Sequence, residues 1–393
     1  MKNRNILISG ASIAGPALAY WLRRYGFNPT VVERAPELRD GGYAVDFRGA
    51  SMHAIERMGL LGEVRRAQTH MGEVLFVDQD NKPLASMPSE FMSGEVEILR
   101  GDLARILYEA SRQDTEYLFG DSITSLTQGE EGVRVTFQHA PPRTFDLVVG
   151  ADGLHSNVRA LAFGDESRFV RDLGYYISIF TTPNLLELDY SGRYFSVPGK
   201  TVGVYSARRN TEAKVLCAFA SPPLTYDRHD SAQQKRLLAD RFAGEGWEIP
   251  RFLEAMWNAP DFYFDSISQV HMDSWSSGRT VLLGDAAYCA SPLSGMGTGL
   301  AVVGAYVLAG ELQAAGGDHR TAFARYQEQM RGYVQQSQKQ GQDGGTWFVP
   351  SSRAMLWFRN QIYRGMSFAP WKKLISKMAM GAGNAITLKE YPV

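Results

Sequence analysis

The spacing of apolar residues changes twice along the chain, and these changes divide it into three regions. Up to about residue 170, short apolar runs such as Ile6–Ile8 alternate with segments of helical periodicity. From Gly174 to Phe219, aromatic and β-branched runs are separated by Gly, Pro and Asn, which is typical of antiparallel strands. The strand-and-helix pattern resumes at Thr280, so the antiparallel unit is inserted into the first unit and is not appended to it.

The same pattern predicts individual elements. In the first region we expect a helix that ends at Gly26 and one that Asp102 caps, with strands at Thr30–Glu33, Glu97–Arg100 and Phe145–Gly150 and a helix at Ser51–Met58. In the inserted region we expect mostly helix over Ser231–Trp257, and strands at Tyr175–Phe180, Tyr194–Val197, Val202–Tyr205 and Val215–Phe219. Beyond Thr280 we expect a polar helix at Asp318–Gln342 that breaks at Gly344-Gly345, a helix at Met355–Met366, and a further helix after Pro370.

The first apolar strand leads into a turn with glycine at two of the three positions of a phosphate-binding turn, Gly10 and Gly15. Such a turn brings the backbone close to the ligand and points N–H groups of a helix N-terminus at its negative charge. Ser12 stands at the second position, where a small residue still permits a close approach. Glu33 follows at close to the ~20 residues expected for the acidic group that binds a ribose. The alternative is an ordinary strand–turn–helix unit.

A second segment is interpreted as the opposite end of the same site. The strand Thr280–Leu283 ends at Gly284-Asp285, which places a carboxylate where it can accept hydrogen bonds from ribose or ribityl hydroxyls. The small-residue loop Ser294–Gly299 then opens a strongly apolar helix, whose N–H groups can stabilise negative charge on a reduced flavin. The alternative is a buried helix whose glycines serve packing alone. Together the two segments predict a cofactor that spans both, FAD.

Other polar residues follow strands near this predicted edge. Arg100 is expected to contact the sugar or phosphates of the cofactor, and the alternative is an ion pair with Asp102 or Glu97. Asp152 either caps the helix that follows it or contacts the cofactor. Three more candidates flank the Gly41-Gly42 turn, which should lie near the nucleotide: Arg39, Asp46 and Arg48.

Composition narrows the class of protein. With 41 basic and 42 acidic residues and a net charge of −1, the chain concentrates no positive charge for a nucleic acid. The seven histidines and two cysteines show no metal-ligand spacing, and unpaired cysteines suit a reducing cytoplasm. No apolar run approaches the ~20 residues of a spanning helix, and the first strand begins too early for a signal peptide. No Ser-His-Asp or Cys-His set stands out, so we assign the hard chemistry to the cofactor.

In their order and spacing these motifs resemble those of the class A flavoprotein monooxygenases, the p-hydroxybenzoate hydroxylase-like family. The resemblance is carried by Gly10–Gly15, Glu33-Arg34, Arg100–Leu103, Gly150–Gly153 with Ser156 and Arg159, and Gly284–Ala287 with Pro292 and Gly295–Gly299. Within the family, Gly41–Asp46 and Leu99–Leu107 look like the tetracycline-inactivating monooxygenases and related polyketide-tailoring hydroxylases.

The resemblance implies an α/β fold with three parts. A Rossmann-like FAD/NAD(P)-binding domain is expected at 1–72, 98–170 and 268–343. An inserted antiparallel-sheet substrate domain is expected at 73–97 and 171–267, and a C-terminal helical segment at 344–393.

The resemblance also implies roles for single residues. Glu33 would hold the adenosine ribose, Arg100 the sugar–phosphate region and Asp285 the ribityl–pyrophosphate segment, while Arg39 would meet NADPH. The expected cofactor-binding set is Gly10, Ser12, Ile13, Ala14, Gly15, Glu33, Arg34, Arg39, Asp46, Arg100, Asp152, Gly284, Asp285, Pro292, Gly295, Met296, Gly297 and Thr298. The expected substrate contacts are Ile177, Ile179, Arg193 and Phe219, although the two isoleucines and the phenylalanine fit plain core as well.

The implied reaction is a hydroxylation. NAD(P)H, with NADPH expected, reduces FAD, O2 adds to give a C4a-hydroperoxyflavin, and one oxygen atom passes to an aromatic or enolic, polyketide-like small molecule. No catalytic side chain is assigned, because a phenolate or enolate of the substrate supplies the push. Alternatives are a flavin-dependent reductase or halogenase of the same fold, or a flavin-bearing sequestration protein without turnover. We expect a cytoplasmic monomer or weak homodimer whose aromatic tail packs across the two domains or, alternatively, lies on a membrane surface.

Overall fold

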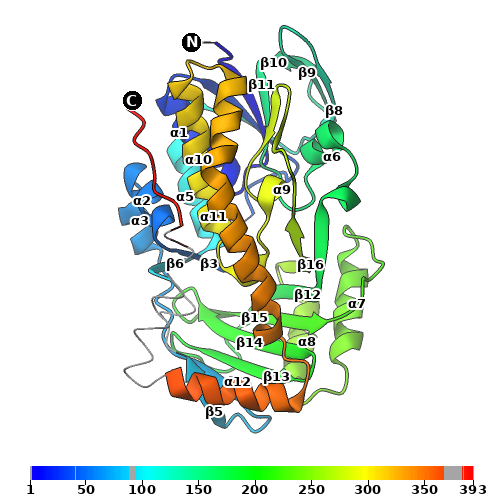
Figure 1. The fold of residues 1–393 in the computed structure, drawn as a ribbon. Helices are drawn as coiled ribbons and strands as arrows, with labels where there is room; N and C mark the ends of the chain where they lie inside the picture. Colours follow the sequence, from blue (N-terminus) through cyan, green and yellow to red (C-terminus); the bar gives the residue numbers. More distant parts are fainter. Residues whose placement is uncertain (1, 40, 88–93, 367–382, 384, 393) are drawn as a thin grey trace.

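A computed structural model of the chain describes residues 2–39, 41–87, 94–366, 383 and 385–392. Figure 1 shows two units stacked along the length of the molecule, one built on a mainly parallel sheet and the other on a larger, mainly antiparallel sheet. The long helix α11 (His319–Phe348) runs from the first unit to the second. The predicted α/β fold with an inserted antiparallel sheet is therefore confirmed.

The first unit is built on a six-stranded sheet in the order β17-β18-β11-β1-β2-β7. Its central strand β1 (Asn5–Ser9) pairs in parallel with β11 (Leu147–Gly150) and β2 (Asn28–Glu33), and β18 (Thr280–Leu282) pairs in parallel with β11. The strand interiors are buried on both faces, which explains their continuous apolar runs. Parallel strands end at a common edge, so the turns that follow β1, β11 and β18 meet there. The outer strands are β7 (Glu116–Phe119) and β17 (Ser276–Ser277).

Helices cover this sheet. α1 (Ala14–Arg24) packs against α5 (Arg100–Ser111) and α10 (Gly297–Ala314), and α10 packs against α11 (Figure 1). α1 ends before Gly26, as predicted, because Gly26 takes a positive φ of 81°. The remaining elements of the unit are α2 (Ala50–Arg57), α3 (Leu61–Arg66), α6 (Asn157–Phe163), α9 (Asp285–Tyr288) and a small sheet of β8 (Ile123–Gln128), β9 (Val133–Phe137) and β10 (Arg143–Phe145).

The predicted cap of α5 is wrong. The helix begins at Arg100, so Asp102 lies within its first turn and does not precede it. The Asp102 carboxylate lies 3.0 Å from the Arg208 guanidinium of the second unit. A contact between the units therefore uses the carboxylate that local pattern assigned to a cap.

The predicted break at Gly344-Gly345 is also wrong, because α11 continues to Phe348. These glycines serve close packing instead. A Cβ on Gly345 would lie 2.5 Å from the Tyr175 ring, and one on Gly344 would lie 3.0 Å from the Leu293 carbonyl oxygen. Tertiary contact thus overrides the weak helix propensity of glycine.

The second unit is a seven-stranded sheet in the order β16-β12-β15-β14-β13-β4-β5. Successive side chains of β12 (Val170–Pro183) point to opposite faces. Tyr176 and Phe180 pack in a core with α7 (Ser231–Phe242) and α8 (Ile249–Trp257), whereas Ile177 and Ile179 pack against Tyr43 and Leu293 of the first unit. The other strands are β4 (Val74–Val77), β5 (Pro83–Met87), β13 (Gly192–Val197), β14 (Lys200–Ala207), β15 (Glu212–Ala220) and β16 (Phe262–Val270), which confirms the four predicted antiparallel strands.

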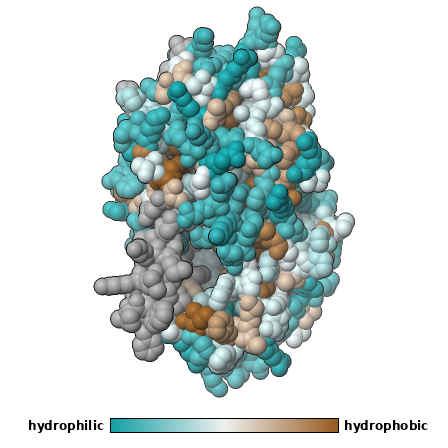
Figure 2. All heavy atoms as spheres, viewed as in Figure 1, coloured by the Kyte–Doolittle hydropathy of each residue, from teal (hydrophilic) through white to brown (hydrophobic). Residues whose placement is uncertain are grey.

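The C-terminal part contacts both units. α12 (Arg353–Met366) packs on β5 and β13, with Trp357 65% exposed on its outer side. Residues 385–392 return to the first unit, where Tyr391 packs on α10. Figure 2 shows a mostly hydrophilic surface with scattered apolar patches, one of them at the lower end of the molecule. The helix predicted after Pro370 lies outside the described residues. Within the described ranges, every helix is too short or too polar to cross a membrane.

Candidate functional site

The turn after β1 has the close backbone approach that a phosphate-binding turn requires. Gly10 has a φ of +107°, and a Cβ there would lie 2.5 Å from the Ala151 carbonyl oxygen. A Cβ on Gly15 would lie 1.9 Å from the Gly10 carbonyl oxygen, so any side chain would push α1 away from the turn. Ser12, between them, is half-buried and its Oγ accepts a hydrogen bond from Arg100 Nη2 at 2.7 Å. Arg100 and the turn therefore meet, although 88 positions separate Arg100 from Ser12.

Glu33 lies beside the same turn, at the end of β2. Its Oε2 accepts a hydrogen bond from the Ala11 backbone N–H at 2.8 Å, and its Oε1 accepts one from the Ala35 N–H at 2.9 Å. Both contacts fix the carboxylate at the edge of the sheet where the turn lies. Ile13 and Ala14, the other turn residues of the predicted set, are buried at the start of α1, and Arg34 is exposed.

Asp285 follows β18 and faces a recess. Its side chain is exposed to solvent although its neighbours Gly284 and Ala286 are buried. Burial by the surrounding protein nevertheless raises the pKa of Asp285, and the Arg100 guanidinium opposes this increase. A side chain that solvent reaches and that protein surrounds lines a recess. Arg100, Ser12 and Asp285 thus meet at the carboxyl edge of the sheet, where ligands of open α/β sheets bind.

The loop before α10 forms another wall of this region. Ser291 takes a φ of +74°, which is strained for a residue with a side chain, and its Oγ is buried without a partner among the described residues. Pro292 is exposed next to the buried Ser291, and Gly295, with a φ of +63°, is exposed between the buried Ser294 and Met296. Met296, Gly297 and Thr298 then lead into the first turn of α10, whose N–H groups face the loop end. Strain, exposure and a helix N-terminus together mark a ligand-facing loop.

Glycines of α11 support this loop from behind. A Cβ on Gly341 would lie 2.1 Å from the Ala290 carbonyl oxygen, next to the strained Ser291. Gln340 Nε2 also donates a hydrogen bond to the Ser294 carbonyl oxygen at 3.0 Å. The conformation of the loop is therefore held by α11.

Asp46 lies between the loop and the second unit. It belongs to β3 (Ala44–Phe47), and a Cβ on Gly295 would lie 3.9 Å from its Oδ1. Arg48 Nε donates a hydrogen bond to Asp46 Oδ2 at 2.5 Å. Burial raises the pKa of Asp46, against the effect of Arg48. Asp46, a predicted cofactor contact, thus lies beside the loop and forms an ion pair with Arg48.

Asp152 is not the N-cap of α6, which is Ser156, but its carboxylate bonds to that cap residue and to the first turn of the helix. Its Oδ1 accepts a hydrogen bond from Ser156 Oγ at 2.5 Å, and its Oδ2 accepts one from the Val158 N–H of α6 at 3.0 Å. Ser9 Oγ of β1 donates a third, at 3.3 Å. Burial raises the pKa of Asp152 despite these bonds. The carboxylate orders the edge between β1 and α6, whichever ligand lies there.

The four predicted substrate contacts separate into two groups. Ile177 and Ile179 face the first unit, near the Pro292–Ser294 turn. Phe219 is buried on the opposite face, stacked on Tyr176 under α7. Arg193 alternates with Tyr194 on β13 and shares the face of Phe195, which also packs under the helices. The structure therefore brings only the isoleucines to the face that looks toward the recess.

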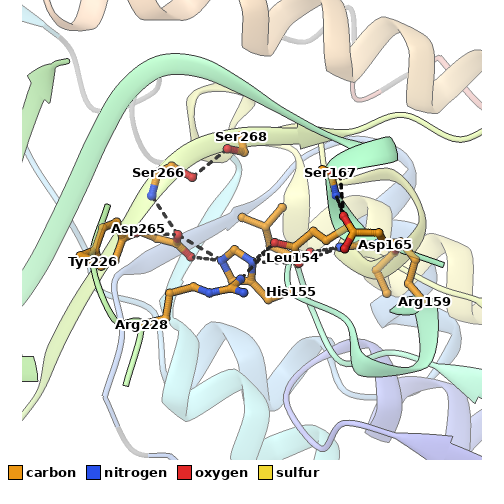
Figure 3. Close-up of polar contacts among 12 residues, drawn as sticks. Leu154, His155, Arg159, Asp165, Ser167, Tyr226, Arg228, Asp265, Ser266 and Ser268 are labelled. Carbon is orange, nitrogen blue, oxygen red and sulfur yellow. Dashed lines mark hydrogen bonds and ion pairs between the residues drawn. The ribbon is translucent and has the colours of Figure 1, made fainter. Parts of the chain in front are cut away.

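The sequence analysis missed a charged cluster at the boundary of the units (Figure 3). His155 Nδ1 lies 3.0 Å from Glu166 Oε1, and His155 Nε2 lies 3.0 Å from Asp265 Oδ2 of β16. Arg228 and Arg159 also reach Glu166. Burial opposes the charge on His155, but the two carboxylates raise its pKa to about 9. The sequence feature that could have indicated this cluster is the position of His155, two residues after Gly153, which belongs to a motif of the predicted site. Within the described residues no group of three or more His, Cys, Asp or Glu side chains is arranged to hold a metal ion.

A parallel sheet with a recess at its carboxyl edge, under an inserted antiparallel sheet, defines the class as a two-unit flavoenzyme. The sequence matches the family model described as FAD binding domain over residues 3–235 and 258–339. The chain belongs to this FAD-binding family and is an FAD-dependent monooxygenase.

Similar proteins agree with this assignment. A flavin-dependent monooxygenase of Legionella longbeachae is 38% identical over 394 residues, which cover 99% of this chain and 99% of the relative. The crystal structure of tetracycline destructase Tet(55) is 40% identical, with a TM-score of 0.84 over 99% of each chain. That of tetracycline destructase Tet(51) is 36% identical, with a TM-score of 0.84 over 100% of each chain.

Proposed function

We propose that this monooxygenase hydroxylates a tetracycline-type substrate, an aromatic and enolic polyketide, with NADPH and O2. The observation that carries the proposal is the end-to-end likeness to two tetracycline destructases, at 36% and 40% identity and a TM-score of 0.84 for each. An apolar sheet face that looks toward the recess supports it, because a fused-ring substrate needs a large dry wall.

We propose that FAD lies along the carboxyl edge of the parallel sheet. Glu33 would bind its adenosine ribose, and the turn with Gly10 and Gly15 would hold the pyrophosphate at the N-terminus of α1. Arg100 and Asp285 would hold the sugar and ribityl segment. The rest of the proposed contact set is Ser12, Ile13, Ala14, Arg34, Arg39, Asp46, Asp152, Gly284, Pro292, Gly295, Met296, Gly297 and Thr298. The glycine geometry supports this placement, since side chains at positions 10 and 15 would collide with backbone.

When bound, FAD supplies the electrons and activates O2. The side chains of this chain position the substrate and shield the reacting atoms from water. Ile177 and Ile179, with Tyr43 and Leu293, form an apolar surface that excludes water from the reacting atoms. The N-terminus of α10 would offer backbone N–H groups to negative charge on the bound flavin.

The electron donor is part of the proposal. Arg39 is exposed, and we assign it to the phosphates of NADPH. The domain boundaries given above, a cytoplasmic location and a monomeric or weakly dimeric state are kept as proposals from the sequence.

The test is turnover of the purified, FAD-loaded protein with tetracycline under ¹⁸O2, with NADPH and NADH in parallel. We expect tetracycline to accelerate NADPH oxidation and to gain one ¹⁸O atom by mass spectrometry. A product that forms without O2 would instead indicate a reductase, and a product that requires chloride or bromide a halogenase. If tetracycline binds but leaves NADPH oxidation unchanged, the protein sequesters it and the proposal fails.

A further inference from the structure

A two-stranded ribbon between the units carries a carboxylate that no role described so far uses. β6 (Val96–Leu99) pairs antiparallel with β3, and Glu97 lies directly opposite Asp46. Their neighbours Val45 and Ile98 point into the core of the first unit. Because side chains alternate along a strand, Asp46 and Glu97 share the other face of the ribbon, toward the seven-stranded sheet.

Glu97 has one hydrogen bond where its two oxygens can accept several. The side chain is 9% exposed, and Thr69 Oγ1 donates to its Oε1 at 2.5 Å. Among the described residues no donor contacts its Oε2. Arg48, whose charge lowers the pKa of Glu97, is bonded to Asp46. A carboxyl group that is 9% exposed and bonded to a single hydroxyl is expensive to keep ionised for structure alone.

The position of Glu97 joins the two halves of the proposed active site. On one side is Asp46, which lies beside the exposed Gly295 of the loop before α10. On the other side are Tyr194 and Tyr205 of the second sheet, whose pKa values are raised by burial and, to a smaller extent, by the charge of Glu97. Tyr205 Oη also accepts a hydrogen bond from the Ala44 N–H of β3 at 3.1 Å, which fixes the sheet against the ribbon.

The protonation state of Glu97 is poised near neutrality. Burial raises its pKa to about 7, with Asp46 adding to the increase, while the Thr69 hydroxyl and Arg48 oppose it. Within the ranges that the structure describes, the titratable groups that face it are Asp46 and Arg48 from the ribbon and Tyr194 and Tyr205 from the sheet. A carboxyl group in this state can take up a proton and release it at physiological pH.

We propose that Glu97 is a catalytic residue that accepts the proton of the phenol or enol hydroxyl of the substrate before oxygen transfer. The proposal rests on the proposed function above, because it needs a substrate with such a hydroxyl. The O–H bond of the substrate breaks, a new O–H bond forms at Glu97 Oε2, and the electron pair stays on the substrate oxygen. Negative charge moves from Glu97 to the substrate, which becomes the more electron-rich oxygen acceptor.

Three variants test this assignment. Glu97→Gln keeps the size and the Thr69 contact but cannot accept the proton, and Glu97→Asp keeps an acid at a shorter reach. Glu73→Gln, an exposed glutamate before β4, is the matched control. The rate of ¹⁸O insertion into tetracycline is measured from pH 5.5 to 9, with flavin reduction by NADPH and FAD affinity measured separately.

We expect Glu97→Gln to lower oxygen insertion by ~100-fold or more above neutral pH, within the range of general base catalysis. Below pH 6 the difference should shrink, because wild-type Glu97 is then protonated. Flavin reduction and FAD affinity should match wild type, and NADPH should be consumed without product. Glu97→Asp should insert oxygen faster than Glu97→Gln, and the midpoint of its pH–rate profile should differ from that of wild type. Glu73→Gln should behave as wild type.

An unchanged pH profile in Glu97→Gln, at full or reduced amplitude, overturns the assignment, since a structural role would scale the rate without moving its pH dependence. If Glu97→Gln does not take up FAD, Glu97→Asp decides: a wild-type midpoint overturns the assignment and a displaced one supports it. If wild-type protein makes no ¹⁸O-labelled tetracycline, the proposed function has failed and the role of Glu97 fails with it.

Discussion

The C-terminal residues supply the partners of a buried charge, and this gives a sharp test of how the chain is held together. Glu311 lies on the apolar helix α10 with a fully buried side chain. Its Oε1 accepts hydrogen bonds from Tyr391 Oη at 2.8 Å and from Lys389 Nζ at 2.7 Å. Burial alone would raise the pKa of Glu311, but these bonds and one from Gln329 lower it. The carboxylate is therefore ionised at neutral pH and depends on the tail.

The expected loss follows from these contacts. Tyr391→Phe removes one hydrogen bond to an ionised group, for which about 1.5–3 kcal/mol of unfolding free energy is typical. The ring itself stays packed on α10, where a Cβ on Gly310 would lie 2.2 Å from it. A chain that stops before Lys389 removes both tail partners and leaves Glu311 with Arg325, at 3.9 Å, as its remaining ion-pair partner among the described residues. Loss of the partner of a buried charge costs about 3–5 kcal/mol.

Urea unfolding of the FAD-loaded protein, followed by circular dichroism and flavin fluorescence, measures these losses. Glu390→Gln is the control, because Glu390 is 83% exposed and its ion pair with Arg57 should contribute about 1 kcal/mol or less. In a Glu311→Gln background, Tyr391→Phe should lose much of its effect, because the charged acceptor is gone. A Tyr391→Phe loss below about 0.5 kcal/mol, or one unchanged by Glu311→Gln, would refute the reasoning.

Three other predictions concern the turn, the unit boundary and the sheet faces. Gly15→Ala places a Cβ 1.9 Å from the Gly10 carbonyl oxygen, so equilibrium dialysis should show FAD binding weakened by at least ~10-fold, or lost. The two carboxylates raise the pKa of His155 to about 9, so protonated His155 stabilises the folded state fully below about pH 6.5 and this stabilisation is lost as pH rises through 9. His155→Gln should therefore make the melting temperature less dependent on pH between about 6.5 and 9. A pH dependence equal to that of wild type would contradict this. Phe219→Ala should lower the unfolding free energy by about 3–5 kcal/mol in urea titrations, with little change in KM for tetracycline. Ile179→Ala should instead raise KM for tetracycline. The reverse result would mean that the two faces of the sheet are misassigned.

Much of the first unit could be predicted from the sequence because its signals are local. A buried parallel strand needs an apolar run, and a turn that touches backbone needs glycine. Gly10, Gly15 and the strands around them can therefore be predicted from the sequence in their correct order. The Gly284-Asp285 strand end is legible for the same reason. Their meeting at one edge follows from the rule that parallel strands end together.

Where prediction failed, a distant part of the chain decided. Asp102 reads as a cap, yet Arg208 binds its carboxylate from the second unit. Gly344-Gly345 reads as a helix break, yet Tyr175 and Leu293 require small residues there and the helix continues. Propensity is worth at most about 1 kcal/mol per glycine, which a packed contact easily exceeds.

The sequence by itself determined the class of fold and the strands and glycine turns that meet at the carboxyl edge of the parallel sheet, because each depends on neighbours within a few positions. Only the tertiary structure decided which face of the seven-stranded sheet looks toward the first unit, and so separated Ile177 of β12 from Phe219 of β15. It alone also set Glu97 beside Asp46 and Tyr205, and His155 between two carboxylates. Strand pairing and desolvation, which fix a side chain's partners and its charge, are properties of the folded chain and leave no local mark in the sequence.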